Sequence, residues 1–558
     1  MGLMPAEKVH GFDTSDNPLG NWIIQRYEQL KSDRTNWDSY WDELSYYIIP
    51  KKNNVYGSRQ SGDRASQDVL FDSTSIHSNE LLAAALHSML TNPSTVWFGL
   101  STGNDEMDKD DEIRKWIDTV VHLMINVFNN SNFQTEVHEM YLDMGCFGAS
   151  TLLIEDDEET VLRFKSNPIY QHYIDENNKG IVDTVFRQYK WSARQIIQEF
   201  GEKNVPDYII QHDKIVGSST KFEIIQGVGP RTKRDPKKLN PQNKLFYSCH
   251  VLVQSRHVLR NSGFDIMPFI VPRWSKVSGE IYGRSPGMKA LADIKMINAL
   301  MKITLQAGQL SIAPPLQAPD DGILMPIKTM PHAINIYRAG SKDRIEPLNT
   351  GVNPKLGEDM MEQTRMRVRS AFFIDQLQLG ENNPQMTATE VLQRTEEKLR
   401  MLGPILGRQH FEFLQPLIER CFSALSLKGY LPQPPKKMKT NQLNIKYTSQ
   451  LAKAQKAAEG DAFTRVMQIL SPLAGTHPDM LDNIDTDEVV RFAADIFTLP
   501  PNILRDKSEV EGMRQQRQEV AAQQAQMAQQ EASASALQKG AAGAKDIAEA
   551  SNAQGMGM

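Results

Sequence analysis

The sequence of 558 residues contains little cysteine and no long apolar run. Its three cysteines, Cys146, Cys249 and Cys421, lie far apart and form no CxxC pair. Disulfides and a zinc site are therefore not expected, and reduced thiols are. Residues 1–19 contain no apolar signal core, and no segment approaches the roughly 18 uninterrupted apolar residues of a membrane helix. We expect a soluble protein that is made in the cytoplasm and has no membrane partner.

The sequence also lacks the motifs of nucleotide-dependent and metal-dependent enzymes. The dipeptide Gly-Lys does not occur, so the GxxxxGK[ST] phosphate loop of an ATPase is absent. Gly227-Val-Gly229 is not followed by the third glycine of a dinucleotide-binding fingerprint, and His138-Glu139 is not followed by the second histidine of a zinc protease. We therefore expect no catalytic residues, no cofactor and no metal site, and we predict that the protein is not an enzyme.

An excess of basic residues is missing too. The formal net charge is -6 and the sequence pI is about 6.1, whereas proteins that grip nucleic acid through its phosphates are usually basic. Tight DNA binding is disfavoured, which leaves room only for a DNA-contacting surface of low affinity. Two acidic runs, 105–112 and 155–159, could hold a divalent cation. The first lacks the glycine of a calcium loop and the second falls at an expected hairpin turn, so solvated surface is the favoured interpretation.

The length exceeds that of one ordinary core and predicts two or more packing units. Hydrophobic spacing predicts an α+β fold that is mainly helical. Expected helices cover 23–48, 75–90, 113–128, 133–144 (ending at Gly145), 192–200, 285–310, 355–374 and 387–427, with a smaller helical region over 451–497. Expected strands cover 151–155, 161–165, 181–189, 222–225, 246–253 and 268–271.

Proline and glycine divide the second half of the chain. Seven prolines interrupt the segment 313–354, which can hold only short strands and turns. Residues 376–386 have the composition of an exposed loop. Pro404 and Pro416 predict kinks in the long helix that follows. From Lys507 the chain is rich in Gln, Ala and Ser, which predicts a segment that is either disordered or helical within an assembly.

Three stretches, taken in order, resemble the head-to-tail connector (portal) proteins of short-tailed bacteriophages, the podoviruses. The resemblance spans about Trp22 to Leu427, roughly three quarters of the chain. The first stretch is Tyr40-Trp-Asp-Glu-Leu-Ser-Tyr-Tyr-Ile-Ile-Pro50 with Phe71-Asp-Ser-Thr74, Leu82-Ala-Ala-Ala-Leu86, Leu90-Thr-Asn-Pro93 and Trp97-Phe98. The second is Arg273-Trp274, Gly279-Glu-Ile-Tyr-Gly-Arg-Ser-Pro-Gly287, Asp293-Ile-Lys295 and Asn298. The third is Met386-Thr-Ala-Thr-Glu-Val391, Arg394, Glu397, Leu402-Gly-Pro404, Arg408, Leu414, Pro416-Leu-Ile418 and Arg420.

The resemblance implies a subunit of a dodecameric ring with wing, stem, clip and crown regions around a central DNA channel. The matching divisions of this chain are a wing region (1–284), a first stem helix (285–310), a clip (311–354), a second stem helix (355–375), a tunnel loop (376–386), a long kinked wing helix (387–430), a crown (431–506) and a tail (507–558) that is disordered or forms a barrel helix. Implied partners are double-stranded DNA held weakly and without sequence specificity, the terminase large subunit, tail or adaptor proteins, and capsid and scaffolding proteins. The implied location is the capsid vertex of the virion, after synthesis in the host cytoplasm.

Candidate channel residues are the stem cations Lys295, Lys302, Arg365 and Arg369, together with the loop residues Glu381, Asn382, Asn383 and Gln385. The stem cations, with Lys289 and Arg367, could instead pair with Glu358, Asp359 and Glu362 of neighbouring stems, and the loop could be ordinary surface. A bare ring of lysines would hold DNA tightly, whereas translocation needs a shallow energy profile. Two rival functions stay open from the sequence: a nuclease that uses the acidic runs, and an adaptor or internal head protein that forms no ring.

Overall fold

The structure, a computed structural model, describes residues 18–52, 55, 70–108, 110–215, 220–235, 237–238, 240–312, 316–317, 346–347, 354–377, 402–436, 438, 444–447, 460, 462–469, 485–496, 505, 509–530 and 535. The described residues fall into two compact units. The first unit takes its residues from 1–99, 120–432 and 445–454, and the second from 100–119, 433–444 and 455–558. The prediction of more than one packing unit is confirmed, and so is the mainly helical α+β class.

Most of the predicted helices are present in the first unit. Its helical elements are α1 (Pro18–Ile48), η1 (Pro50–Lys52), α2 (Thr74–Leu90), α5 (Phe133–Phe147), η3 (Ile169–Gln171), α6 (Ala193–Phe200), η4 (Glu202–Asn204), α7 (Asp207–Lys214), η5 (Pro241–Asn243), α8 (Pro286–Ile312), α9 (Pro354–Ala371), α10 (Ile374–Leu377), a helical run over 402–409, the π-helix η6 (His410–Leu414) and α12 (Gln415–Leu427). The α7 helix was not predicted. It buries only Ile209, whereas the equally short α6 buries Ala193, Ile196 and Phe200 at helical spacing.

Two antiparallel sheets complete the first unit. Strands β4 (His172–Glu176), β5 (Val182–Ser192), β6 (Lys221–Pro230), β7 (Phe246–Leu252) and β8 (Val258–Phe264) form a five-stranded sheet in sequence order. Strands β3 (Leu162–Pro168), β2 (Ser150–Asp156) and β9 (Phe269–Ile270) form a three-stranded sheet. All predicted strands are present. Strands β4 and β8 were not predicted: β4 has five residues, and the middle of β8 (Arg260-Asn-Ser-Gly263) has no large apolar residue that would indicate a strand.

Helices cover both faces of the five-stranded sheet. Ile224 and Ile225 are neighbours on β6, so their side chains point to opposite faces. Ile225 packs with residues of α1, among them Ile23 and Tyr27, while Ile224 packs with residues of α6 and α7. The sheet is therefore fixed from both sides by apolar contacts.

The other end of α1 reaches the helical core of the unit. Trp41 is fully buried and donates a hydrogen bond from Nε1 to the carbonyl oxygen of Phe147, at 3.0 Å. Its ring meets that of Tyr282 edge-on, with centroids 5.2 Å apart. Because α1 is long, it spans the distance from the five-stranded sheet to the helices α2, α5 and α8 that lie beside its second half.

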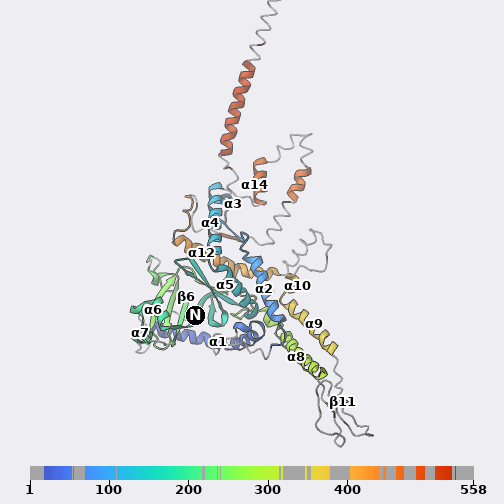
Figure 1. The fold of residues 1–558 in the computed structure, drawn as a ribbon. Helices are drawn as coiled ribbons and strands as arrows, with labels where there is room; N and C mark the ends of the chain where they lie inside the picture. The colour runs from blue at the N-terminus through green and yellow to red at the C-terminus, as the bar shows by residue number, and fades with distance from the viewer. Residues whose placement is uncertain are drawn as a thin grey trace, which may run out of the picture. The chain divides into compact units, whose positions relative to one another are not determined.

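Helices α8 and α9 run side by side and extend from the body of the unit toward β11 (Figure 1). They match the two helices predicted on either side of the proline-rich segment. The short strands β10 (Leu316–Gln317) and β11 (Glu346–Pro347) pair antiparallel, with Leu316 opposite Pro347. This pairing brings the segment that follows α8 next to the segment that precedes α9.

The helix over 402–427 contains one π-helical turn, η6, directly before Pro416. Pro416 has no N–H to donate to the oxygen of Glu412, four residues back. The neighbouring N–H of Gln415 donates instead to the oxygen of His410, five residues back. The distortion predicted at Pro416 thus takes the form of a π-turn. Pro404 stands in the first described turn, and the kink predicted there involves the preceding turn, which lies outside the described residues. The predicted capping box at Thr387 and Glu390 lies outside the described residues.

The second unit contains α3 (Asp105–Asp108), α14 (Thr486–Ile496) and helical runs over 462–469 and 509–530. Arg491 of α14 pairs with Asp111 at 2.8 Å, and Arg514 pairs with Asp487 at 2.6 Å. Three elements have residues in both units: β1 (Phe98–Ser101), α4 (Asp111–Asn130) and β12 (Asn444–Tyr447). The stretch 509–530, in the tail predicted to be disordered or helical, is a helix with mostly exposed residues.

The predicted end of the fourth helix at Gly145 is wrong. Helix α5 continues to Phe147, and Gly148 at φ +82° ends it with a backbone bond to the oxygen of Met144. Gly145 has a different role, because a Cβ there would stand 2.1 Å from Oδ1 of Asn79 on α2. A glycine inside a helix and a glycine at its end cannot be told apart from the sequence alone.

We predict that Gly148→Ala strongly destabilises the first unit. Its backbone is left-handed, and a Cβ would lie 2.3 Å from the carbonyl oxygen of Gly283. The combined strain and clash should lower the free energy of unfolding by about 2–4 kcal/mol, measured by urea denaturation. Gly407→Ala is the control, because nothing lies within 4 Å of its Cβ position and alanine favours a helix by about 1 kcal/mol over glycine. Equal effects of the two changes would contradict the prediction.

Candidate functional site

The paired helices α8 and α9 carry the four described residues of the predicted channel set. The first half of α8 is anchored in the core, with Ala290, Ile294 and Ile297 buried. The second half packs along α9 but has no fully buried residue among the described ones. Four of its apolar side chains are exposed: Ile303 (60%), Leu305 (48%), Leu310 (41%) and Ile312 (88%). Two methionines on α9 are exposed as well, Met360 (42%) and Met366 (53%).

Most of the stem cations are engaged by groups of the same chain. Lys295 pairs with Glu43 of α1, and Nζ of Lys302 lies 5.9 Å from the centroid of the Phe71 ring. The arginines of α9 pair with carboxylates: Arg365 with Asp72 at 2.8 Å, Arg367 with Asp293 at 3.4 Å, and Arg369 with Glu362 at 3.5 Å. Lys289 is exposed and forms no ion pair within the described part of the chain. Glu358, Asp359 and Glu362 were expected to pair with cations of neighbouring stems; within the single chain, Glu362 pairs with Arg365 and Arg369 of its own helix.

Asp72 joins the segment before α2 to both long helices. Its Oδ2 accepts hydrogen bonds from Nε and Nη2 of Arg365, at 3.0 and 2.8 Å, and its Oδ1 accepts the N–H of Thr74 at 2.8 Å. Oδ1 of Asn298 on α8 accepts the N–H groups of Phe71 and Asp72, at 2.8 and 3.1 Å. One short segment therefore holds α8 through Asn298 and α9 through Arg365.

These bonds also fix the charge of Asp72. Burial of the carboxylate raises its pKa, but hydrogen bonds from Thr74 and Arg365 outweigh burial and hold the pKa below the ordinary value of 3.8. Asp72 is therefore ionised at neutral pH. The neighbouring Arg365 has its pKa raised, first by its hydrogen bond to Asp72.

A second ionic cluster surrounds Arg273, whose side chain is 2% exposed. Its Nε and Nη2 bind the two carboxylate oxygens of Glu412 at 3.0 and 2.9 Å, and Nη1 binds Glu176 at 2.9 Å. The carbonyl oxygens of Ile281 and Gly180 accept further bonds at 3.0 and 2.8 Å. Burial opposes the charge, but the two carboxylates raise the pKa of Arg273. The cluster ties β4 to the π-turn η6. Arg273 is part of a motif that the sequence shows, but its partners Glu176 and Glu412 are 97 and 139 residues away and no local pattern relates them to it.

A third buried pair lies between η1 and α5. Nζ of Lys52 binds Asp143 and Glu139, both at 2.7 Å, and Asp143 is fully buried. Burial raises the pKa of Asp143 to about 6, while Lys52 opposes this rise. The nearby thiol of Cys146 has its pKa raised by burial and by Asp143, so it is a poor nucleophile at neutral pH.

The acidic runs are used for local structure. Asp108 accepts the N–H and the hydroxyl of Thr102, both at 2.8 Å, and Asp157 accepts the N–H and the hydroxyl of Thr160 at 3.1 and 2.8 Å. Among the described residues, His, Cys, Asp and Glu side chains form no group of three or more that could hold a metal ion. None of the described helices is both long and apolar enough for a membrane crossing. The loop residues Glu381, Asn382, Asn383 and Gln385 lie outside the described residues.

Comparison with known proteins shows which family this chain is similar to. Residues 21–504 match the family model described as bacteriophage head to tail connecting protein. The chain is 32% identical over 523 residues to a probable portal protein of Bordetella phage BPP-1, covering 92% of this chain and 94% of that protein. It is 30% identical over 527 residues to the portal protein of Salmonella phage epsilon15, covering 93% of this chain and 94% of that protein.

We predict that the Asp72–Arg365 contact makes stability depend on acid pH. Because the pKa of Asp72 is lowered in the folded state, its contribution is complete above about pH 4 and is lost as pH falls through the folded-state pKa. At pH 7 Asp72→Asn should lower the free energy of unfolding by about 2 kcal/mol.

Thermal unfolding of both proteins between pH 3 and pH 7 measures this difference. It should stay constant at higher pH and shrink at the acid end. Glu358→Gln on α9 serves as the control, because Glu358 is exposed and forms no ion pair within the described residues. A difference between Asp72→Asn and the parent that does not change with pH would refute the role given to Asp72.

Proposed function

The chain belongs to the bacteriophage head-to-tail connecting protein family and functions as a structural portal protein, and we propose that twelve copies form a closed ring around duplex DNA. In such a ring each subunit uses two different surfaces, and rotation brings the last copy back to the first. The ring would stand at the capsid vertex of the virion, where head and tail meet.

The observation that carries this proposal is the exposure of apolar side chains on two sides of the second half of α8, with Ile303 and Leu310 on one side and Leu305 and Ile312 on the other. Ile303, Leu305, Leu310 and Ile312 together leave a substantial apolar area on one helix half without cover from the described residues. Such surfaces on soluble proteins usually mark contacts with other chains. A neighbouring α8–α9 pair is an apolar helical partner of matching length, so copies packed side by side would bury both flanks.

We extend the proposal to the regions of the chain. Residues 1–284 and 387–430 would form the wing, α8 and α9 the stem, 311–354 the clip, 376–386 a tunnel loop, 431–506 the crown and 507–558 a tail that could assemble as a helical barrel. The clip would dock the terminase large subunit during packaging and then the tail or adaptor proteins. The ring would also meet scaffolding and capsid proteins and nucleate head assembly. The chain would act as a conduit for DNA and would carry no enzyme activity.

Lys295, Lys302, Arg365 and Arg369, together with Glu381, Asn382, Asn383 and Gln385, would face the channel as weak DNA contacts. The carboxylates beside the stem cations support this. Glu43 stands next to Lys295, Asp72 next to Arg365 and Glu362 next to Arg369. A compensated cation releases fewer counterions from DNA than a bare one, so it binds phosphate less tightly. Sliding DNA would then meet a shallow energy profile.

We predict that Ile303→Asp blocks ring formation while the subunit stays folded. Placing a carboxylate in a buried helix contact forfeits roughly 1.5–3 kcal/mol of apolar burial per interface, which weakens each contact by about 10–100-fold. Light scattering measures the mass of the assembly, and circular dichroism confirms folding. Ile215→Asp, at a position that is 56% exposed at the end of α7, is the control and should assemble normally. Rings of normal mass from Ile303→Asp would remove the support for this interface.

A second prediction concerns the tunnel loop. Asn382→Lys combined with Asn383→Lys adds two cations per subunit, and such a ring should hold DNA more tightly through counterion release. Phage particles carrying this variant should contain less DNA, measured as the length of packaged genome per head. Asn382→Gln with Asn383→Gln keeps the loop neutral and should package normally. Equal packaging by both variants would show that the loop does not meet DNA.

A further inference from the structure

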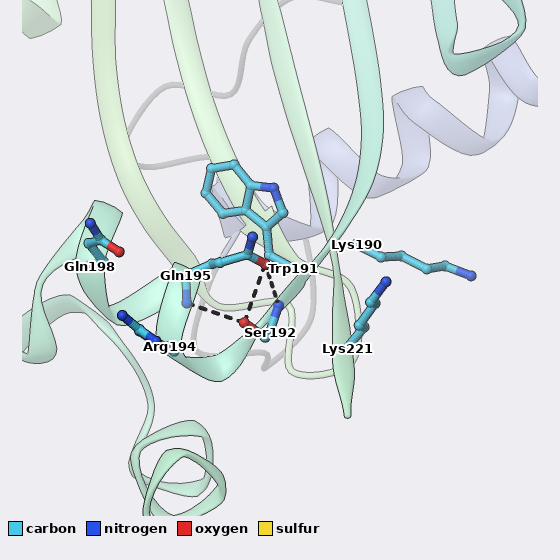
Figure 2. A pocket seen from close by; sticks show the side chains of 7 residues that line it. All are labelled: Lys190, Trp191, Ser192, Arg194, Gln195, Gln198 and Lys221. Carbon is cyan, nitrogen blue, oxygen red and sulfur yellow. Dashed lines mark hydrogen bonds between the residues drawn. The ribbon is translucent and has the colours of Figure 1, made fainter. Parts of the chain in front are cut away.

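A hollow on the five-stranded sheet carries basic residues that the proposed channel does not use. It lies where β5 ends, α6 begins and β6 starts, and its volume is about 700 Å³. Figure 2 shows Lys190 and Lys221 on one side of the turn at Ser192, and Arg194 on the other. Gln195 and Gln198 of α6 add amide groups to the lining.

The three cations of this hollow form no ion pair. Within the part of the chain that the structure describes, neither Lys190, Arg194 nor Lys221 forms an ion pair or a side-chain hydrogen bond. Of the nearby acids, Glu199 binds Arg260 at 3.0 Å, and Glu223 stands opposite Lys190 in the pairing of β5 with β6. Three cations beside this one unneutralised carboxylate leave the hollow with a net positive charge.

Most of the stem cations differ in this respect. Arg365, Arg367 and Arg369 each have a carboxylate within 4 Å, and so does Lys295. Against the formal net charge of -6 of the whole chain, the hollow is a local group of positive charge. Like charges placed together repel one another and add nothing to folding, so the arrangement is explained more readily by an anionic partner.

We propose that this hollow binds the phosphate backbone of duplex DNA. The lining favours DNA over an acidic protein. Protein interfaces need an apolar centre, and here Trp191 alone supplies apolar area and is already partly buried by the sheet. Interfaces with DNA are polar and positively charged, and Lys, Arg, Ser and Gln side chains are common phosphate donors.

The proposed contact would not distinguish one DNA base sequence from another. The backbone at the start of α6 is already used, since Oγ of Ser192 accepts the N–H of Gln195 at 3.4 Å and Oε1 of Gln195 accepts the N–H of Ser192 at 3.0 Å. Binding would therefore rest on the long side chains around the turn. Flexible cations that reach phosphates fix a duplex without distinguishing its bases.

This inference rests on the portal function, which brings DNA to the protein, but it assigns contact to a different surface. Helix α6 and the pair α8–α9 lie on opposite sides of the first unit (Figure 1). The compensated stem would let DNA slide, while the uncompensated hollow would hold it. The same subunit would thus offer DNA one surface for passage and another for attachment.

The test uses the full-length assembled protein and a labelled 30-base-pair duplex, with binding measured by fluorescence anisotropy over a range of salt concentrations. The hollow variant is Lys190→Gln, Arg194→Gln and Lys221→Gln. The matched control is Lys179→Gln, Lys233→Gln and Lys237→Gln. These three lysines are exposed, form no ion pair within the described residues, and give the same charge change.

The hollow variant should bind DNA at least tenfold more weakly than the control at low salt. Each lost phosphate contact lowers the slope of log K against log salt by about 0.9, so three lost contacts at one subunit lower it by about 2.7. If the two triple variants lose the same affinity and the same slope, only net charge matters and the site is refuted. If a glutamate-rich peptide competes fully with DNA at equimolar concentration, the hollow is a protein-docking site and the DNA assignment is wrong.

Light scattering of the same samples separates this inference from the proposed function. Absence of rings from the parent chain would count against the proposed ring but would leave the comparison of the two variants intact. Normal rings combined with equal DNA binding by the two variants would count against the hollow alone.

Discussion

The position of the two long helices depends on a buried carboxylate. Asp72 binds Arg365 of α9, and its own backbone N–H is bound by Asn298 of α8. The segment that contains Asp72 leads directly into α2, so the contact links the extended helices to the helical core. A carboxylate that accepts this many hydrogen bonds stays ionised. Its hydrogen bonds fix the orientation of the groups they join, which a purely apolar contact would not do. The apolar flanks of the distal halves can then stay free for neighbouring subunits.

Charge compensation distinguishes the surfaces of this portal subunit. The stem arginines each stand beside a carboxylate, whereas the three cations that line the hollow at Ser192 form no ion pair among the described residues. A subunit with a net negative charge can still offer DNA two kinds of contact, because affinity follows local uncompensated charge more closely than the total. The buried cluster at Arg273 is a third case, in which the charge is satisfied internally and serves to join β4 to the π-turn.

The parts of the fold that were predicted correctly are those with a long repeated pattern. The apolar period along 23–48 and 285–310 was sufficient to predict α1 and α8, because each repeat adds independent support. The strand β8 and the helix α7 were missed since their patterns are short or polar. Of the candidate channel residues, Lys295 and Arg365 were predicted to lie on two long helices, and they lie on α8 and α9. Their partners Glu43 and Asp72 are more than 200 residues away in the chain, and no local pattern relates them.

The mainly helical α+β class and the two helices around the proline-rich segment could be inferred from the order of residues alone, and the motifs indicated membership of the portal family. Local spacing and turn chemistry depend on neighbours in the chain, so they can be read without a fold. Three features became visible only in the folded chain: which charges are compensated, that Gly148 rather than Gly145 ends α5, and that Lys190, Arg194 and Lys221 line one hollow. Those features arise where distant segments are brought together, and electrostatic and steric interactions act through space rather than along the chain.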